Sequence, residues 1–586
     1  MGTCRVPSLQ SRPAADSALR LPRPRGLGWL AGAAERVSGL RELDGLYRRH
    51  AAGLPPGEFV RAALRTLRIS YAVDGSAGTP VPPSGPLLIV ANHPFGAADG
   101  LVLADWLLPR RPDLQLLANE LLCRVPEMAP LIMPVDVFRR GASLPGLRRA
   151  LRHLEQGGAL VIFPAGEVSR VDFAGRCVSD PPWSETAALL ARRSGARILP
   201  VCLRGHAAWW SLTAGAIHPR LRTALLARDL LHQRGSHVQL VPGQLIEPGE
   251  LARLPEPAQT PYLRLLTYSL AEPEAAPPPR TLAPISPPVA PEALAAAVAA
   301  LPPRRCLFVQ GEFAVYLAPA QEMPLLLQEI ARLRELSFRL VQEGSGLPAD
   351  TDRFDAHYRH LFVWHRTRHE ILGAYRLGFV AEILPRHGVE GLYTHTLFEF
   401  DRHLFARTGP AVEMGRSFVS PDWQRSFVAL RLLWSGIASL LQARPEIRCL
   451  YGPVSISPGY SAAGRALIAE VLTRHHSDSH LRQQIRPRHP PRIATAGERR
   501  PVVAALADPQ LLSRVIARIE RGPGLPVLLR HYLELNGVFA GFNVDASFGG
   551  TLDGLVFVDV ARIPARILAR YGAASRRAAG ADPASG

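Results

Sequence analysis

A histidine and an aspartate lie close together in the segment Leu87–Gly100, which reads LLIVANHPFGAADG. Its apolar run between a Gly-Pro pair and an asparagine predicts a short buried strand. His93 follows this strand, Gly96 permits a sharp turn, and Asp99 enters the next helix. A carboxylate beside an imidazole fixes the ring tautomer and stabilises the protonated ring, as general-base chemistry requires. Alternatively, His93 is an ordinary loop histidine and Asp99 an acidic residue at a helix N-terminus.

Strands and helices alternate around this segment, which predicts a mostly parallel sheet in one α/β domain. In such a sheet, His93 would lie at the carboxyl edge, where open α/β folds bind ligands. The predicted strands are Leu87–Ala91, Leu114–Ala118, Ile132–Val135, Ala159–Phe163, Arg197–Leu203 and His237–Val241, and the predicted helices are Asp99–Leu108, Leu144–Gln156 and Glu185–Ser194.

A second α/β domain is predicted over residues 304–575. Residues 271–303 contain ten prolines and separate it from the first domain. This density favours extended polyproline structure over a ladder or a long helix. The predicted strands of the second domain are Cys306–Gln310, Phe313–Tyr316, Arg368–Gly378, Gly391–Phe400, Leu450–Ile456, Gly537–Val544 and Gly554–Asp559, and its predicted helices are Pro324–Glu343 and Trp423–Gln442.

The remaining segments complete the predicted organisation. Residues 1–60 form a basic extension with an amphipathic helix over 26–50, residues 61–270 form the first domain, and residues 576–586 form a disordered tail. The apolar spacing of the helix fits an interfacial membrane helix, and packing on the following domain explains it as well. The basic segment 476–500 reads as a solvated loop.

Composition narrows the class of protein. The chain has 586 residues, 47% of them hydrophobic, which is typical of a globular protein with two to four domains. A net charge of +18 favours phosphate-rich partners such as nucleic acid, anionic lipid or acidic carrier proteins. The six cysteines are scattered, which suits a reducing compartment and no zinc site. No signal peptide, transmembrane helix or metal site is predicted.

Four blocks in the first half resemble the lysophospholipid (glycerolipid) acyltransferase family over about Thr66–Gly249. They are Asn-His with the later Asp99, a block ending at Arg139 and Arg140, the segment Phe163–Arg170 (FPAGEVSR), and a Leu-Pro-Val strand. The resemblance implies that His93 is a general base on a lipid alcohol and that Asp99 orients it. It implies that the arginines of these blocks hold the anionic group of the acceptor, since a guanidinium fork suits phosphate or carboxylate. The substrate-binding residues implied are Asn92, Gly96, Arg139, Arg140, Gly166, Glu167 and Arg170.

Two departures from the family pattern stand out. Five residues separate His93 from Asp99 where the family usually has four, and the turn at Gly96 would have to absorb the extra residue. Ala165 replaces the usual Glu before the Gly of the third block, with Glu167 just after it. The second departure indicates an acceptor other than ordinary lysophosphatidate.

The second half resembles the GNAT-like ornithine N-acyltransferase group, once labelled hemolysin-like. The resemblance is carried by HEILGAYR at 369–376, EMGRSFVSPDWQR at 413–425, LYGPVSI at 450–456, and 530–555. These enzymes look like acyl-homoserine-lactone synthases and use 3-hydroxyacyl chains from acyl carrier protein. The resemblance implies Glu399 or Glu413 as base or ammonium ligand. It implies that Arg416, and less directly Arg425, holds a carboxylate or the carrier's phosphate, although structural salt bridges explain each residue too.

Taken whole, the chain resembles fused, bifunctional bacterial ornithine lipid synthases. The resemblance implies an acyl carrier protein (or CoA) thioester as donor and no bound cofactor. It implies ornithine, lyso-ornithine lipid, acyl carrier protein and a membrane surface as partners, without nucleic acid, at the cytoplasmic face of the inner membrane. Two alternatives stay open: a glycerolipid acyltransferase whose second half docks a carrier or membrane, and a non-enzymatic basic binder of membrane or nucleic acid.

Overall fold

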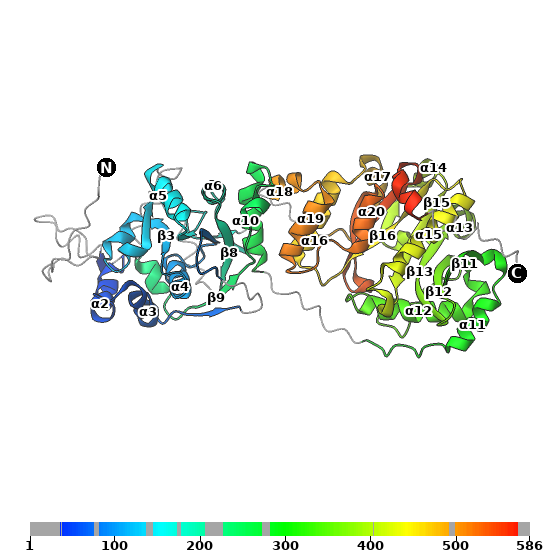
Figure 1. Cartoon of the computed structure of the whole chain (residues 1–586), viewed down its shortest axis with the longest axis horizontal. Coiled ribbons are helices and arrows are strands. Elements are labelled where there is room, and N and C mark those ends of the chain that lie inside the picture. Colours follow the sequence, from blue (N-terminus) through cyan, green and yellow to red (C-terminus); the bar gives the residue numbers. More distant parts are fainter. Residues whose placement is uncertain are drawn as a thin grey trace, which may run out of the picture. The chain divides into compact units, whose positions relative to one another are not determined.

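The chain folds into two compact α/β units (Figure 1). The first holds the described residues of Met1–Glu272 and Ala496–Ala505, and the second holds those of Pro273–Thr495 and Leu506–Gly586. The structure is a computed structural model that describes residues 35–36, 38–74, 81–135, 144–172, 177–205, 227–271, 282–401, 403–491 and 499–571.

A seven-stranded sheet forms the centre of the first unit, in the order β1-β9-β8-β2-β5-β3-β4. All neighbouring strands are parallel except the pair β8 and β9. The sheet is therefore mostly parallel, as the sequence predicts. The strands are β1 (Ser70–Val73), β2 (Leu87–Ala91), β3 (Leu114–Asn119), β4 (Ile132–Val135), β5 (Ala159–Ile162), β8 (Arg197–Arg204) and β9 (His237–Pro242), with β6 (Arg170–Asp172) and β7 (Cys177–Ser179) in a separate hairpin. The helices are α2 (Leu40–His50), α3 (Pro56–Thr66), α4 (Ala97–Leu107), α5 (Leu144–Glu155), α6 (Thr186–Ser194), α9 (Pro248–Leu251), α10 (Glu256–Ser269) and α18 (Arg500–Ala505).

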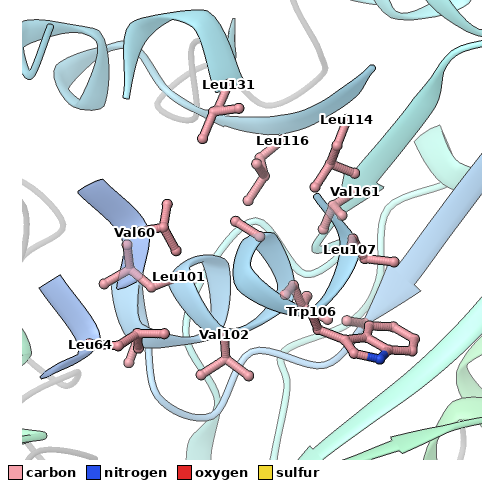
Figure 2. Close-up of a cluster of buried hydrophobic side chains, with 14 of the residues drawn as sticks. Val60, Leu64, Leu101, Val102, Trp106, Leu107, Leu114, Leu116, Leu131 and Val161 are labelled. Carbon is pink, nitrogen blue, oxygen red and sulfur yellow. The ribbon is translucent and has the colours of Figure 1, made fainter. Parts of the chain in front are cut away.

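Helix α4 lies in the core of this unit and carries Asp99. Its side chains are apolar on nearly all sides, which is the pattern of a helix buried on all faces. Figure 2 shows Leu101 and Val102 near Val60 and Leu64 of α3, and Leu107 near strand residues of the sheet. Strand β2 is buried at every position, because helices cover both faces of a parallel sheet. The strand that ends before His93 and the helix that carries Asp99 are therefore both fixed by the core.

The described part of the basic N-terminal extension packs on the first unit. In α2, the Tyr47 hydroxyl donates to both carboxylate oxygens of Glu127 at 3.0 Å, and its ring lies against Phe59. Asp44 of the same helix is buried. These contacts favour the interpretation that α2 packs on the first domain. Residues 26–34 and 37 of the predicted helix lie outside the described residues. Within the described chain, no helix combines the length and apolar content needed to cross a bilayer.

The second unit is built on an eight-stranded sheet in the order β10-β11-β12-β13-β15-β16-β19-β18. Only the pair β15 and β16 is parallel. Its strands are β10 (Cys306–Gln310), β11 (Phe313–Pro319), β12 (Arg359–His365), β13 (Glu370–Phe379), β15 (Ala411–Val419), β16 (Cys449–Ile456), β18 (Val538–Asp545) and β19 (Thr551–Asp559), with β14 (Phe398–Phe400) and β17 (Ile485–Pro487) paired apart. The helices are α11 (Pro291–Ala299), α12 (Pro324–Arg339), α13 (Val380–His387), α14 (Leu404–Thr408), α15 (Phe427–Ala443), α16 (Ala462–His475), α17 (Ser479–Gln484), α19 (Pro509–Ile519) and α20 (Val527–Glu534).

Helices cover both faces of this sheet. Phe362 and Trp364 of β12 pack in a cluster with α11 and α12, whereas Leu361 of the same strand lies against Gly436 of α15. Successive residues of a strand point to opposite faces, so these contacts place α12 and α15 on opposite sides. The predicted α/β fold class with two sheet-containing units is confirmed.

Several segments of this unit differ from the sequence prediction, which also lacked strand β12 and helices α16 and α19. The predicted strand over 391–400 is two short 3₁₀ turns, η7 (Val389–Gly391) and η8 (Tyr393–Thr396), followed by only three strand residues. Residues 479–487 of the predicted loop form α17 and β17. Within the proline-rich segment, helix α11 begins at Pro291, a position where a missing N–H costs nothing, and it buries Leu294 and Val298 in the core.

Candidate active sites

The imidazole of His93 and the carboxylate of Asp99 meet at the carboxyl edge of the first sheet. His93 Nδ1 lies 2.9 Å from Asp99 Oδ2, and the Phe95 N–H donates to the same oxygen at 2.9 Å. Asp99 is fully buried, whereas the His93 side chain is 18% exposed. Because Nδ1 faces the carboxylate, Nε2 is the nitrogen left to act on a substrate. The pair has the geometry of a general base oriented by a carboxylate.

The turn between His93 and Asp99 absorbs the extra residue found in the sequence. Gly96 precedes α4 with φ 62° and ψ −130°, a conformation that residues with a Cβ rarely adopt. The Asp99 N–H donates to the Gly96 carbonyl and begins the helix. The Phe163 ring, from the end of β5, stacks on the His93 ring at 4.1 Å between centroids. The imidazole is thus fixed by a hydrogen bond at one nitrogen and by an aromatic ring on one face.

Asp180 is a second buried carboxylate behind this turn, and the sequence analysis missed it. It accepts hydrogen bonds from the His93 N–H at 3.2 Å, the Ser169 hydroxyl at 2.5 Å and the Trp183 indole at 2.8 Å. The Ser169 N–H in turn donates to the His93 carbonyl at 2.9 Å. Asp180 therefore ties the His93 turn to the segment that follows β5. Its position after the β6–β7 hairpin gave no sequence signal.

Burial dominates the electrostatics of Asp99. It raises the pKa of the Asp99 carboxyl, since desolvation disfavours the charged form, and the nearby charge of Asp180 acts in the same direction. The hydrogen bonds from His93 and Phe95 act the other way. The charged form of a carboxylate in this setting is stabilised by a hydrogen bond from the imidazole. A base that takes a proton from an alcohol needs this stabilisation.

The remaining residues predicted to bind substrate in this unit fall into three groups. The Asn92 amide donates to the Leu203 carbonyl at 2.9 Å and accepts from the Leu203 N–H at 2.7 Å. It therefore joins the ends of β2 and β8 in the interior. Glu167 and Arg170 form an exposed ion pair with each other beside the turn at Gly166, which has φ 67°. Arg139 and Arg140 lie outside the described residues.

In the second unit, a cavity of about 230 Å³ opens where two parallel strands part. Strands β15 and β16 pair only over Ala411–Glu413, and Gly452 follows the last paired residue of β16. A Cβ at Gly452 would lie 1.9 Å from the Met414 carbonyl oxygen, so only glycine fits this close approach. The cavity is lined by Ser337, Phe338, Val341, Glu343, Tyr393, Arg416, Ser417, Phe418, Val419, Gln424, Pro453, Ser455, Leu528, Phe548 and Asp553.

Arg416 enters this cavity from a β-bulge. Arg416 and Ser417 of β15 together face the single residue Tyr375 of β13, and Arg416 has φ 46°. A bulge of this kind redirects a side chain, and left-handed backbone at a non-glycine residue costs about 1–3 kcal/mol. The guanidinium lies over the rings of Tyr393 and Phe548, at 4.7 and 4.6 Å from their centroids. The local strain is consistent with a functional position.

A buried network of three arginines and three aspartates supports Arg416. Each arginine contacts two of the aspartates, at nitrogen–oxygen distances of 2.5 to 3.5 Å. Burial alone would raise the pKa of Asp355, but its arginine partners outweigh burial and hold the pKa below its usual value. The network balances its own charge. It consists of Arg334, Arg376, Arg416, Asp350, Asp352 and Asp355.

Two further carboxyls line the cavity outside this network. Burial raises the pKa of Glu343 to about 8, and the charge of Asp553 acts in the same direction. Burial raises the pKa of Asp553 to about 7, although the Ser455 hydroxyl donates to it at 2.8 Å. Carboxyls with pKa values near neutrality in a cavity are candidates for binding cations or moving protons. The sequence analysis named neither residue.

Only one of the four residues predicted as the second site lines the cavity, namely Arg416. Glu413 is buried and accepts from the Tyr358 hydroxyl and the Thr394 N–H, both at 2.8 Å. It thereby anchors η8, which presents Tyr393 to the cavity. Burial raises the pKa of Glu413. The Glu399 carboxylate is exposed and accepts from Arg488 at 3.2 Å, and Arg425 is exposed beside α15.

Two family models match the chain. Residues 29–255 match the model described as "Acyltransferase", and residues 333–435 match the one described as "Acetyltransferase (GNAT) domain". The chain is therefore an enzyme that transfers acyl groups, with an acyltransferase-like first region and a GNAT-like second region. Among the described residues, no group of three or more potential metal ligands is found.

The chain is also similar to several named enzymes. A glycine N(alpha)-acyltransferase of Phocaeicola vulgatus is 29% identical over 40% of this chain and 76% of its own length. An L-ornithine N(alpha)-acyltransferase of Brucella abortus is 27% identical over 42% of this chain and 86% of its own length. A lyso-glycine lipid O-acyltransferase of Bacteroides thetaiotaomicron is 26% identical over 25% of this chain, and this chain spans about half (53%) of that relative.

One solved structure also aligns with the chain. It is the 1-acyl-sn-glycerophosphate (LPA) acyltransferase PlsC from Thermotoga maritima, which is 19% identical over 42% of this chain and 88% of its own. The TM-score is 0.26, too low to support an argument. The family matches show an acyltransferase, and the named relatives are enzymes that act on an amino acid or a lyso-lipid.

Proposed function

We propose that the chain makes an ornithine lipid in two consecutive acyl transfers. The second unit would join a 3-hydroxyacyl group to the α-amine of ornithine. The first unit would then esterify the free 3-hydroxyl of the product with a second acyl group. The observation that carries the proposal is the 2.9 Å contact between His93 and Asp99 on a chain that also holds the Arg416 cavity. The named relatives support it, because they include enzymes for an amide-forming and an ester-forming step.

The amide-forming step needs a neutral amine beside a polarised thioester. The amine nitrogen attacks the thioester carbonyl, the new C–N bond forms, the C–S bond breaks, and the carrier thiol leaves. The attacking ammonium must first lose a proton, so the step needs a general base at the amine. Arg416 is placed to pair with the carboxylate of the amino acid, since a guanidinium binds a carboxylate through two parallel hydrogen bonds.

The ester-forming step needs a base on a lipid alcohol. His93 Nε2 would take the proton from the 3-hydroxyl while its oxygen attacks the second thioester. The contact with Asp99 would hold the ring in the tautomer that leaves Nε2 unprotonated and would stabilise the imidazolium that forms. General-base assistance of this kind is worth about 10²–10⁴-fold in rate.

Both steps use acyl thioesters, and we propose acyl carrier protein as donor for the first, with carrier or CoA for the second. The lyso-lipid intermediate is amphiphilic, so the enzyme would act as a peripheral protein at a membrane surface. Fusing the two units on one chain raises the local concentration of the intermediate at the second site. The net charge of +18 favours the acidic carrier and anionic lipid as partners.

The test uses the purified full chain, ornithine, 3-hydroxyacyl carrier protein and vesicles of anionic phospholipid. We expect a monoacyl amide that is converted to a diacyl product when a second acyl thioester is added. A matched His93→Ala chain should stop at the monoacyl amide. The proposal is contradicted if the wild-type chain forms no amide, or if it acylates lysophosphatidate in preference to the amide.

A further inference from the structure

The charges that line the cavity of the second unit do not balance. Arg416 is the cavity's arginine, and it is already paired with Asp350 and Asp352 of the buried network. Glu343 and Asp553 line the same cavity and influence each other's charge. Within the part of the chain that the structure describes, no hydrogen bond or ion pair is found for the Glu343 carboxylate. The cavity lining therefore contains two carboxyl groups beside an arginine that is already paired with other aspartates.

Burial is the largest cause of the raised pKa values of these carboxyls, and neighbouring carboxyl charges add to it. Each carboxyl is removed from water, and the partial compensation from Arg416 is too weak to restore an ordinary value. A ligand that brings a positive charge between them would supply the missing counter-charge. The Arg416 guanidinium also lines the cavity, so an anionic end of the same ligand can bind beside it.

We infer that Glu343 and Asp553 form a subsite for the side-chain ammonium of a basic amino acid, and that this subsite sets the choice of amine substrate. The inference rests on the proposed amide-forming function and specifies its substrate class. An amino acid with a terminal side-chain amine can place its α-carboxylate at Arg416 and its second ammonium between the two carboxyls. Glycine has no group for the second position, so it would leave the carboxyls unpaired.

The two carboxyls differ in burial and in their role in the sheet, and Glu343 is the better position for a test. Asp553 is buried in β19 and accepts from Ser455 of β16, so its replacement would also disturb the sheet. Glu343 lies beyond the end of α12 and is half-buried. Glu343→Gln keeps the size of the side chain and removes the charge. Glu446→Gln is a matched control, because Glu446 is an exposed partner of Arg444 and does not line the cavity.

The experiment measures amide formation by the full chain with ornithine, lysine and glycine at a fixed level of 3-hydroxyacyl carrier protein. For the wild-type chain and Glu446→Gln, we expect the kcat/KM for ornithine to exceed that for glycine by at least about tenfold, the worth of one charged hydrogen bond. For Glu343→Gln, the KM for ornithine should rise by about tenfold or more, while the values for glycine stay within about twofold.

Three results would overturn the inference. A wild-type preference for glycine would do so, as would an unchanged ornithine KM in Glu343→Gln. An equal loss with all three amino acids would assign Glu343 to the common α-amine instead. Calorimetric binding of ornithine and glycine to the same chains tests the subsite without turnover. Ornithine should bind more tightly than glycine to the chains that retain Glu343, and Glu343→Gln should lose this preference. Absence of amide product with every amino acid, while ornithine still binds selectively, would contradict the proposed function and leave the subsite standing.

Discussion

Replacing Asp99 with asparagine should separate the activity of the first unit from its stability. The Asp99 carboxylate accepts from His93 Nδ1 and from the Phe95 N–H, both at 2.9 Å and through one oxygen. In Asp99→Asn, the carbonyl oxygen can take the place of that oxygen and keep both donors, but the amide carries no negative charge. The imidazolium that forms when Nε2 takes a proton then loses the charge that stabilises it, so the base is weaker.

The size of the effect follows from this loss of the base. We expect the rate of ester formation to fall by about 10²–10⁴-fold, which is about 2.7–5.5 kcal/mol of barrier. Stability should move in the other direction. The pKa of Asp99 is raised in the fold, so at neutral pH the ionised carboxyl costs folding free energy that an amide does not. The free energy of unfolding of the variant should equal or exceed that of the wild type.

The assay follows conversion of purified monoacyl amide to diacyl product, with urea unfolding measured on the same samples. Asp105→Asn is the matched control, because Asp105 lies on the same helix and pairs with the Tyr71 hydroxyl at 2.8 Å, away from His93. That control should keep its ester-forming rate. A loss smaller than about fivefold in Asp99→Asn, or an equal loss in the control, would refute the reasoning.

Two further outcomes follow from buried contacts. Asn92→Ala removes both hydrogen bonds to the Leu203 backbone, so the free energy of unfolding of the first unit should fall by about 2 kcal/mol in urea titrations while amide formation continues. Unchanged stability would contradict a role of these bonds in holding β2 and β8 together. Asp352 and Asp355 have lowered pKa values in the fold, so their contribution to the stability of the second unit is present above about pH 4 and lost as the pH falls further. Urea titrations between pH 6 and pH 2 should show this loss, and a stability that rises on acidification would contradict it.

The sequence predicted that His93 and Asp99 lie close together because both residues lie on one contiguous, regular segment. Strand β2, the turn and α4 follow each other within 21 residues, so hydrophobic pattern and a glycine are enough to bring His93 toward Asp99. The residues that hold this segment from elsewhere in the chain were not predicted. Asp180 is distant in sequence, and its role depends on where the β6–β7 hairpin returns.

The second site depends on contacts that are remote in sequence, and the prediction there was correspondingly incomplete. Arg416 reaches the cavity through a bulge, and a bulge cannot be read from alternation of apolar residues. Glu343 and Asp553 are far apart in the sequence, so only the folded chain shows that they share a cavity. Glu413 fits the local motif, yet the fold uses it to anchor η8.

Lipid mass spectrometry of a bacterial host that makes no amino-acid lipid of its own tests the central claim most directly. The host would express the wild-type chain or the same chain with His93→Ala, at matched protein levels. The account predicts a diacyl ornithine lipid with the wild-type chain, and accumulation of the monoacyl 3-hydroxyamide without the diacyl product in the variant. Diacyl lipid at wild-type levels in the variant, or loss of both lipids, would contradict two successive reactions with His93 confined to the second.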